Sequence, residues 1–353
     1  MEVIKNATSS VTTAYSKVIE ALRHGGGIKG WLKSYLELAK NQYNNLIFAF
    51  KNFSDVNIKL GLYHLERGNY YDARFRFRLV SWFDKNRPEL PYYIGRAFYE
   101  DAKPARAKSY IDQYIESGDE LYLIEALYTR RLINKDTSID NIPFTITAHF
   151  FNILAPVYDV IYLEDDNAPQ YLVFNSLNKI LNKIGKPIAN TTLDLGCGTG
   201  IMGFLSRSTK ISSEITGVDI SEKMFELAKS LKYDKLPVYS QVEHTDATSY
   251  LSKLPADKKF DLITCTNVIN YISSLQEFFA KAYQALDTSG IFVIVFKINK
   301  GEDNAHFDLE IENFNYNPKY VEQLCKNLNF KTLEQDATKL IDGSEGFYMI
   351  LQK

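Results

Sequence analysis

The stretch Thr191–Gly203, TTLDLGCGTGIMG, constrains the fold of this chain more than any other. Leu193 and Leu195 flank an acid in a short apolar run, which predicts a buried strand, and glycines follow at positions 196, 198 and 200. Alternate glycines leave the backbone without Cβ atoms, so that a ligand can approach it closely. A helix predicted to begin near Ile201 adds unpaired N–H groups and the positive end of its dipole. The stretch therefore predicts a nucleotide-type cofactor site at the end of a strand.

Two classes of cofactor have to be weighed against the glycine spacing. The string Gly198–Gly203 satisfies G-x-G-x-x-G, which gives an NAD-linked oxidoreductase as one alternative. In that pattern the first glycine directly follows the strand, but Gly196 already occupies this place. Asp194 would also put an acid beside the pyrophosphate, which Coulomb repulsion disfavours. An acid at the loop instead favours a ligand with a positively charged amino group.

The string D-L-G-C-G-T-G, residues 194–200, resembles motif I of the class I S-adenosylmethionine-dependent methyltransferases. The resemblance implies S-adenosyl-L-methionine as the cofactor and a doubly wound α/β sheet with an antiparallel last strand. The residues that it assigns to the cofactor here are Asp194, Gly196, Cys197, Gly198 and Gly200.

From Thr191 onward, apolar runs alternate with helical patterns. The predicted strands cover 191–195, 214–218, 238–243, 260–265 and 290–296, with helices near 201–209, 221–231, 247–254 and 275–286. This alternation predicts a doubly wound parallel sheet with ligands at the carboxyl ends of its strands. A helix over 318–328 and strands over 330–336 and 346–352 follow, and the resemblance implies that these strands close the sheet as an antiparallel hairpin.

Two further predicted strands end in acids. Asp219 can accept hydrogen bonds from both ribose hydroxyls, and Ile220 would press on the adenine; the alternative role of Asp219 as a helix N-cap suits Ser221 better. In the methyltransferases that the chain resembles, the residue pair that corresponds to Asp246 and Ala247 holds the adenine amino group. Asp246 is also a reasonable N-cap, so both of its roles stay open.

The segment 260–272 resembles motif IV, in which the end of a strand faces the methyl group and the acceptor. Asn267 stands where many relatives carry aspartate, which puts a general base in this loop in doubt. Its carbonyl oxygen can still orient the acceptor or the amine of the cofactor, so Asn267 is both a catalytic and a cofactor candidate. Tyr271 follows as a candidate aromatic wall.

The segment LAPVYD, residues 154–159, resembles an element that precedes motif I in ubiquinone-biosynthesis-like methyltransferases. The resemblance implies that Tyr158 closes over the cofactor and shields its sulfonium, and an ordinary helix aromatic is the alternative. Phe151 and Tyr162 are further candidate walls, since aromatic faces suit a cation. The reachable proton acceptors are Asp159 and Tyr158, together with the histidines at 149 and 306.

The first part of the chain is predicted to be helical. An amphipathic stripe covers 11–22, and glycine or alanine recurs 34 residues apart at 61 and 95 and at 73 and 107, which is the tetratricopeptide period. We therefore expect a tetratricopeptide-like domain over 1–135 and a methyltransferase domain over 136–353, with 136–190 as its lid and N-terminal helices. Arginines cluster before residue 135. We interpret them as a solvated helix face rather than as a surface that docks a partner protein.

Composition narrows the remaining classes of function. A net charge of −2 gives no pull toward nucleic acid, and three scattered cysteines and five scattered histidines predict neither a disulfide frame nor a metal site. The longest uninterrupted apolar runs are too short for a membrane span, and a cytoplasmic location is expected.

The sequence thus predicts a methyltransferase that acts on a small-molecule or protein acceptor, with Tyr158, Asn267 and Tyr271 as candidate catalytic residues. The first alternative is a non-catalytic adaptor that keeps the fold and binds a partner protein through residues 1–135. The second alternative is the NAD-linked oxidoreductase.

Overall fold

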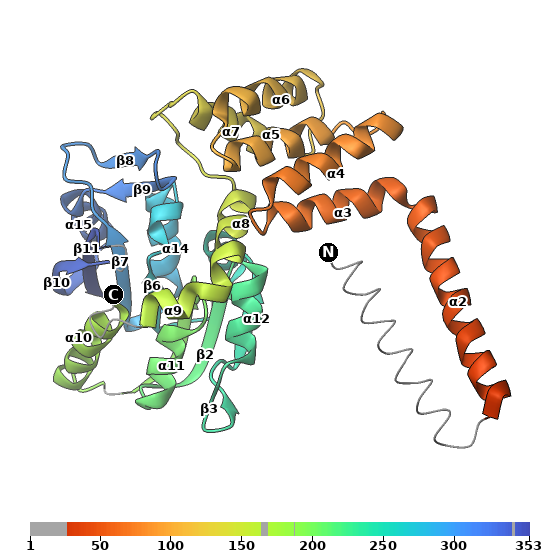
Figure 1. Cartoon of the computed structure of the whole chain (residues 1–353). Coiled ribbons are helices and arrows are strands. Elements are labelled where there is room, and N and C mark those ends of the chain that lie inside the picture. The colour runs from red at the N-terminus through yellow and green to blue at the C-terminus, as the bar shows by residue number, and fades with distance from the viewer. Residues whose placement is uncertain (1–26, 164–168, 187, 341–342) are drawn as a thin grey trace. The chain divides into compact units, whose positions relative to one another are not determined.

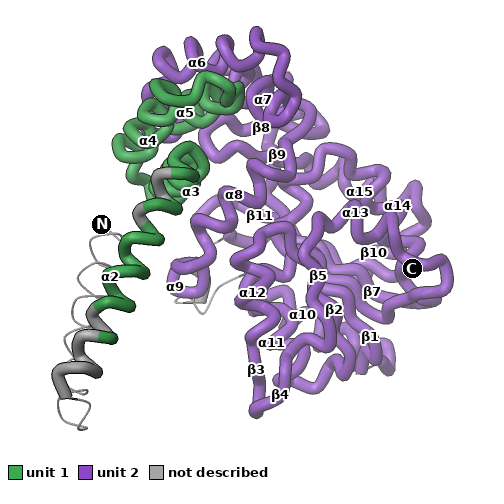
Figure 2. The backbone as a smooth tube through the Cα atoms, turned by 90° about the vertical axis from the view of Figure 1, so that its right-hand side faces the viewer, with its two compact units in different colours: residues 1–97 green, residues 98–353 purple. Residues whose placement is uncertain are grey.

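The computed structural model describes residues 27–163, 169–186, 188–340 and 343–353. The chain divides into two compact units, residues 1–97 and 98–353 (Figure 2). The amphipathic stripe predicted over 11–22 lies outside the described residues. The predicted domain boundary at residue 135 falls within the second unit and stays a prediction.

The first unit is helical over its described residues. It contains α2 (Gly27–Lys51), α3 (Phe53–Leu65), α4 (Tyr70–Phe83) and most of α5 (Leu90–Glu100). Gly61 lets α3 and α4 approach closely, because a Cβ atom there would lie 2.4 Å from the ring of Phe77. That ring also stacks on Tyr93, with 5.2 Å between centroids. A small residue therefore stands at this helix crossing, as the repeat spacing predicts.

The second unit begins with helices that lead into a sheet (Figure 1). These are α6 (Pro104–Glu116), α7 (Leu123–Ile133), α8 (Phe144–Leu154), the 3₁₀ turn η1 (Ala155–Val157), α9 (Tyr158–Leu163) and α10 (Pro169–Lys183). Pro156 lies in η1, where α8 gives way to α9. A proline cannot donate the backbone hydrogen bond of a continuous helix, which accounts for the break.

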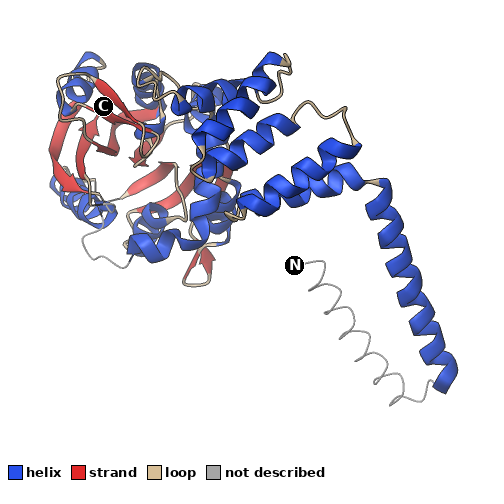
Figure 3. Ribbon diagram, turned by 45° about the horizontal axis from the view of Figure 1, so that its top comes forward, coloured by secondary structure: helices blue, strands red, loops and turns tan. Residues whose placement is uncertain are grey.

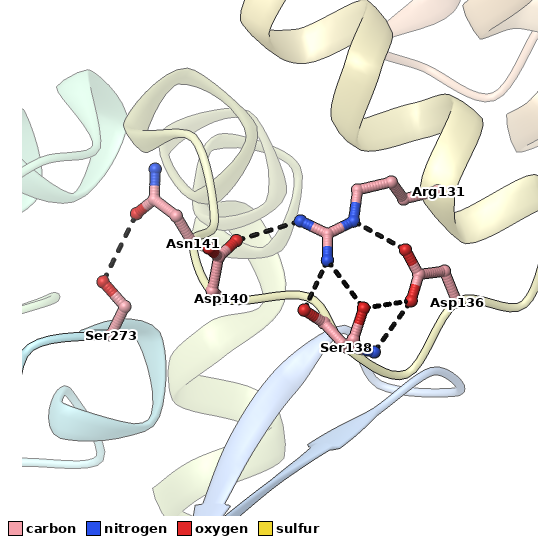
Figure 4. A network of polar contacts seen from close by, with 6 residues as sticks. All are labelled: Arg131, Asp136, Ser138, Asp140, Asn141 and Ser273. Atoms are coloured by element: carbon pink, nitrogen blue, oxygen red, sulfur yellow. Dashed lines mark hydrogen bonds and ion pairs between the residues drawn. The ribbon is translucent and has the colours of Figure 1, made fainter.

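Arg131 holds the linker between α7 and α8 (Figure 4). Its guanidinium binds the carboxylates of Asp136 and Asp140 at 2.8 and 2.9 Å. The hydroxyl of Ser273, which follows the loop after β6, donates to Asn141 Oδ1 at 3.4 Å. These contacts fix the point at which α8 begins.

The second unit contains a sheet whose strands are drawn in red in Figure 3. It has seven strands in the order β10-β11-β7-β6-β1-β2-β5. The strands are β1 (Ala189–Leu195), β2 (Ser212–Asp219), β5 (Gln241–His244), β6 (Phe260–Thr266), β7 (Leu286–Lys297), β10 (Lys331–Lys339) and β11 (Glu345–Gln352). Neighbouring strands from β7 to β5 pair in parallel, whereas β11 is antiparallel to β7 and to β10. The carboxyl ends of β1, β2, β5, β6 and β7 therefore meet at one edge.

Helices cover both faces of this sheet because its strands are apolar on both sides. The helices that follow the strands are α11 (Ile201–Ser208), α12 (Glu222–Ser230), α13 (Ala247–Lys253), α14 (Leu275–Ala285) and α15 (Pro318–Asn327). Alternate residues of β7 enter two different cores. Phe292 and Phe296 pack in the core that contains α13, α14 and α15, while Val293 and Val295 pack in the core that contains α10.

Two short hairpins are additions to the pattern predicted from the sequence. One consists of β3 (Lys232–Tyr233) and β4 (Leu236–Pro237), and the other of β8 (Ala305–Asp308) and β9 (Asn313–Tyr316). The strand predicted over 238–243 is observed only from Gln241 to His244, because Val238 bonds back to Leu231 and Tyr239 turns into the interior.

Among the described residues, one stretch is long and apolar enough to cross a membrane, by length and composition alone. It is Phe144–Ile161, with a mean hydropathy of 1.3 over 18 residues, of which 11% are buried. One such stretch is a weak indication, and the side chains of Asn152 and Asp159 within it bind loops of the sheet. The expectation that this chain has no membrane span stays a prediction.

Candidate functional site

Asp194 ends the central strand, and both of its carboxylate oxygens have partners inside the protein. Oδ2 accepts a hydrogen bond from the Tyr239 hydroxyl and Oδ1 accepts one from the Thr264 hydroxyl, each at 2.7 Å. The side chain is 1% exposed, and this burial raises the pKa of the carboxyl while the two hydroxyls lower it. Asp194 is thus placed to fix the strand end and the loop; direct contact with the cofactor stays a prediction.

The ring of Tyr239 fills the space that three glycines leave open. A Cβ atom would lie 2.4 Å from this ring at Gly203, 2.9 Å at Gly217 and 3.1 Å at Gly200. At Gly200 it would also meet Leu231 at 2.6 Å. Two of the glycines of the G-x-G-x-x-G string are therefore needed for close packing against Tyr239.

The other two glycines of the loop differ from each other. A Cβ on Gly196 would lie 2.1 Å from Val268 in the loop after β6, so this glycine allows two loops of the edge to touch. Gly198 has φ +56° and nothing within 4 Å of a Cβ position. It is thus the glycine of the loop that faces open space. Cys197 between them is buried with its side chain toward Gly217, and burial, together with the charges of two nearby aspartates, raises the pKa of its thiol, so only its backbone is available to a ligand.

Asp219 bridges the ends of two strands. Its carboxylate accepts hydrogen bonds from the backbone N–H of Gly198 and of Ser221, both at 2.8 Å. The side chain is 7% exposed, and burial raises its pKa to about 6 although both backbone bonds lower it. Ile220 beside it is half-buried, and its carbonyl lies 3.0 Å from His244 Nε2. The acid predicted to hold a ribose thus reaches the open glycine of the loop.

The two predicted helix caps are both observed. Ser221 accepts a hydrogen bond from Met224 N at the start of α12, which confirms that it rather than Asp219 is the N-cap. Asp246 accepts one from Ser249 N at 2.8 Å and caps α13. Ala247, half-buried, is the first residue of that helix. The cap uses one oxygen of Asp246, and its adenine contact stays a prediction.

Asn267 follows β6 in an uncommon backbone conformation. Its φ is +60°, in the left-handed region, and its N–H donates to the Val295 carbonyl at 2.9 Å. Its buried Oδ1 has no hydrogen-bond partner among the described residues. A strained backbone and an unpartnered buried oxygen together point to a ligand that supplies the missing donor.

The segment from α8 to α9 is bound to the loops of this edge by its side chains. Thr199 in the glycine loop donates to Asp159 Oδ1 at 2.5 Å. Asn152 Oδ1 accepts from the Ser221 hydroxyl at 2.7 Å and from Lys223 N at 3.1 Å. We refer to residues 144–163 as the lid segment.

The aromatic residues predicted to wall the site lie in this lid segment and in η2 (Ile269–Tyr271). Phe151 meets Tyr271 edge to face, with 5.2 Å between ring centroids. Tyr158 is half-buried at the first residue of α9. The side chain of Tyr162 lies outside the described residues. The structure therefore brings the walls from α8 and η2 into contact, and shielding by Tyr158 stays a prediction.

No base is positioned plainly by these contacts. Asp159 is bound to Thr199, and His306 is exposed on β8. The described part of the chain contains no group of His, Cys, Asp or Glu side chains that could hold a metal ion.

Sequence reasoning missed Tyr239, Thr264 and Asn152 as parts of the site. Tyr239 and Thr264 lie in strand or loop segments whose apolar pattern gives no sign of a polar partner. They are recognised only in the structure, where the hydroxyls of both residues donate to Asp194.

Comparison with known proteins gives a match to a protein family. Residues 189–342 match the family model described as a methyltransferase domain. The chain is similar to the ubiquinone biosynthesis O-methyltransferase of Pseudoalteromonas translucida, with 31% identity over 105 residues, 27% of this chain and 39% of that protein. It is also similar to the malonyl-[acyl-carrier protein] O-methyltransferase of Bacillus cytotoxicus, with 26% identity over 153 residues, 42% of this chain and 48% of that protein. The chain thus spans less than half the length of each.

Among solved structures, the magnesium protoporphyrin IX methyltransferase of Synechocystis with bound S-adenosylmethionine aligns with a TM-score of 0.44 and 18% identity. The alignment covers 62% of this chain and 99% of that one. Residues 189–342 thus match a methyltransferase domain, and the strand order is the mostly parallel α/β arrangement expected from the sequence.

Proposed function

We propose that this protein is an S-adenosylmethionine-dependent methyltransferase. The observation that carries the proposal is the meeting of Gly198 and Asp219. An open glycine, with no side chain near its Cβ position, donates its N–H to a buried carboxylate at the edge where the parallel strands end. This arrangement offers backbone room and a hydroxyl-binding acid side by side, which is what a nucleoside ligand requires.

The residues present fit this cofactor. Asp219 would hold the ribose, Ile220 and Asp246 would contact the adenine, and the unpartnered Oδ1 of Asn267 would accept from the ammonium. When bound, S-adenosylmethionine supplies a methyl group on a positively charged sulfur. The protein's own tasks are to bind the cofactor, orient the acceptor and exclude water. Phe151 and Tyr271 would contribute to the last task.

The dinucleotide alternative is weaker on this geometry. In G-x-G-x-x-G sites the second glycine lets the pyrophosphate approach the backbone. Here that position is Gly200, which Leu231 and Tyr239 cover, and the open position is Gly198. The buried Asp194 beside the loop also disfavours a diphosphate.

The acceptor is proposed to be a small molecule, and the reaction O-methylation. Two similar proteins carry O-methyltransferase names, and an aromatic pair from α8 and η2 suits a small ring better than a folded protein. The helices before residue 135 are proposed to be tetratricopeptide-like and to bind a partner protein, supported by the crossing at Gly61. A cytoplasmic location is part of the same proposal.

Calorimetry with the full chain tests the proposal. Wild-type protein should bind S-adenosylhomocysteine, Asp219→Ala should weaken this binding by roughly 10- to 100-fold, and NADH should not compete. The fold control is Asn317→Ala, which removes the side-chain cap of α15 away from the glycine loop and should bind S-adenosylhomocysteine like wild type. NADH binding in place of S-adenosylhomocysteine would establish the oxidoreductase. Binding of S-adenosylhomocysteine with no transfer of labelled methyl to either the small molecules or the proteins of a lysate would favour the adaptor.

A further inference from the structure

The helix α7 holds the beginning of the lid segment. The Thr145 hydroxyl on α8 donates to Glu125 Oε1 on α7 at 2.6 Å. The linker between the two helices is held from α7 as well, because Arg131 binds two aspartates of that linker. Phe151 lies on the same helix as Thr145, so its position depends on α7.

The same helix also holds the β8–β9 hairpin. Tyr128 follows Glu125 by three residues on α7, on the same face of the helix, and its hydroxyl donates to Glu312 Oε2 at 3.5 Å. The Tyr99 hydroxyl near the end of α5 donates to Oε1 of the same carboxylate at 2.7 Å. The Tyr128 ring also meets Phe307 of β8 edge to face, with 6.4 Å between ring centroids. Two helices thus fix the tip of the hairpin.

The hairpin in turn holds η2, the turn that carries Tyr271. Asn270 is 3% exposed, and its Nδ2 donates to the Phe314 carbonyl of β9 at 2.5 Å. The Tyr316 hydroxyl, also from β9, donates to the Ile272 carbonyl. Since both neighbours of Tyr271 in the chain are bound to β9, this strand fixes the backbone on either side of Tyr271.

The contacts from α7 meet again at one aromatic pair. Phe151 of the lid segment meets Tyr271 of η2 with 5.2 Å between ring centroids. One ring is reached from α7 through α8, and the other through the hairpin and η2. The pair lies at the carboxyl edge of the sheet, because Asn152 beside Phe151 binds Ser221 after β2, and η2 follows β6. The helices α5 and α7 therefore set the position of both rings from outside the cofactor loop.

From these contacts we propose that Glu312 and its donor Tyr99 are positioning residues of the methyltransferase. They act through Tyr271 and keep the aromatic pair closed over the bound cofactor. The helical segment 98–142 thus contributes to the reaction without touching either substrate, because a closed pair excludes water and slows the exchange of the cofactor. The inference rests on the proposed methyltransferase function and adds to it a role for this segment.

Two matched tyrosine variants of the full-length protein test this role. Tyr99→Phe removes a hydroxyl that donates to Glu312, and Tyr348→Phe removes one that donates to Glu334 in the β10–β11 pair; each bond is 2.7 Å long. Both variants should lose comparable stability in denaturant titrations. Only Tyr99→Phe should release S-adenosylhomocysteine faster in stopped-flow experiments, by roughly 2- to 5-fold.

A double-mutant cycle shows whether the effect passes through the aromatic pair. Phe151→Leu removes the ring contact and should itself accelerate the release of S-adenosylhomocysteine. If Tyr99 acts through this pair, adding Tyr99→Phe to Phe151→Leu should change the rate by less than Tyr99→Phe does alone. A purely structural role of Tyr99 would leave the two effects additive.

Three results would overturn the inference. They are release at the wild-type rate from Tyr99→Phe, an equal acceleration in Tyr348→Phe, and additive effects in the double variant. Failure of S-adenosylhomocysteine to bind the wild-type protein would be a different result, because it would overturn the proposed function and the inference with it.

Discussion

The Tyr239 hydroxyl donates a 2.7 Å hydrogen bond to Asp194 across 45 residues of sequence, inside the protein. The ring of the same tyrosine packs over three glycines. One side chain thus binds the buried carboxylate of Asp194 and also fills the space beside the cofactor loop. Tyr239→Phe should retain the packing and leave one oxygen of a buried carboxylate unpaired. We expect a loss of about 1–3 kcal/mol in the free energy of unfolding, measured by denaturant titration. An unchanged midpoint with an unchanged slope would contradict this account of Asp194.

The space around Gly198 can accommodate a methyl group, but we expect a methyl group there to weaken cofactor binding. Gly198→Ala costs about 1–2 kcal/mol because of its positive φ, and the new Cβ enters the space assigned to the cofactor. Gly185→Ala is the matched control, since Gly185 has φ +70° and equally open surroundings outside the loop. Both variants should lose similar stability, and only Gly198→Ala should lose affinity for S-adenosylhomocysteine in calorimetry.

Cofactor affinity should depend on pH through Asp219. Burial raises the pKa of this carboxyl from 3.8 to about 6, so below pH 6 the folded protein increasingly holds the proton and can accept fewer hydrogen bonds. Affinity for S-adenosylhomocysteine should therefore fall as the pH drops from 7 to 5. Asp219→Asn should bind more weakly and show a flatter profile.

The raised pKa of Asp219 has the opposite effect on the stability of the fold, which should fall as the pH rises. Between about pH 4 and 6 the folded state binds more protons at Asp219 than the unfolded chain does. The contribution of this group to the free energy of unfolding is thus present below pH 4 and is lost as the pH rises through 6. Denaturation of wild type and Asp219→Asn across this window measures the difference.

Asn267 combines a backbone strain with an unpartnered oxygen, and two substitutions separate them. Asn267→Gly should relieve the positive φ and change stability by less than about 1 kcal/mol, while Asn267→Ala adds the strain. Both should lower the affinity for S-adenosylhomocysteine or the rate of methyl transfer. Asn329→Gly, at φ +65° in the loop after α15, controls for the backbone alone. If Asn267→Gly keeps both the affinity and the rate of wild type, the Asn267 amide does not contribute to the site.

The contact between Thr199 and Asp159 should govern how fast the ligand leaves. Thr199→Val removes the donor, and we expect S-adenosylhomocysteine to dissociate roughly 2- to 10-fold faster in stopped-flow experiments. Thr199→Ser keeps a hydroxyl and should behave like wild type. If valine and serine give the same rate, the hydrogen bond does not hold the lid segment.

Much of the fold can be predicted from the sequence because its signals are local. The run around Leu193 and the glycines after it predict β1 and its loop, and alternating apolar runs predict the strands of the sheet. Ser221 is recognised as an N-cap because the cap needs only a hydroxyl just before a helix. The β8–β9 hairpin cannot be predicted from local signals in this way. Its Glu312 accepts hydrogen bonds from Tyr99 and Tyr128, which lie far away in the sequence.

The residues predicted for the site follow strands that end at one edge of the sheet, but their contacts could not be predicted from the sequence. Asp194 is expected to meet the cofactor, yet in the structure its two oxygens meet Tyr239 and Thr264. Burial decides this outcome, since a carboxylate that is 1% exposed needs internal donors, and no sequence pattern reports which strand will supply them.

The bond from Tyr99 to Glu312 has a consequence for how this chain can be cut or recombined. Burial and the neighbouring carboxylate raise the pKa of the Tyr99 hydroxyl, so it stays a proton donor to Glu312 at every physiological pH. Truncation before Pro143 would remove Tyr99 and Tyr128 and leave the half-buried carboxylate of Glu312 without these two hydrogen-bond donors. The helical segment 98–142 of the second unit therefore cannot be exchanged for another sequence unless the replacement supplies two hydroxyl donors to Glu312.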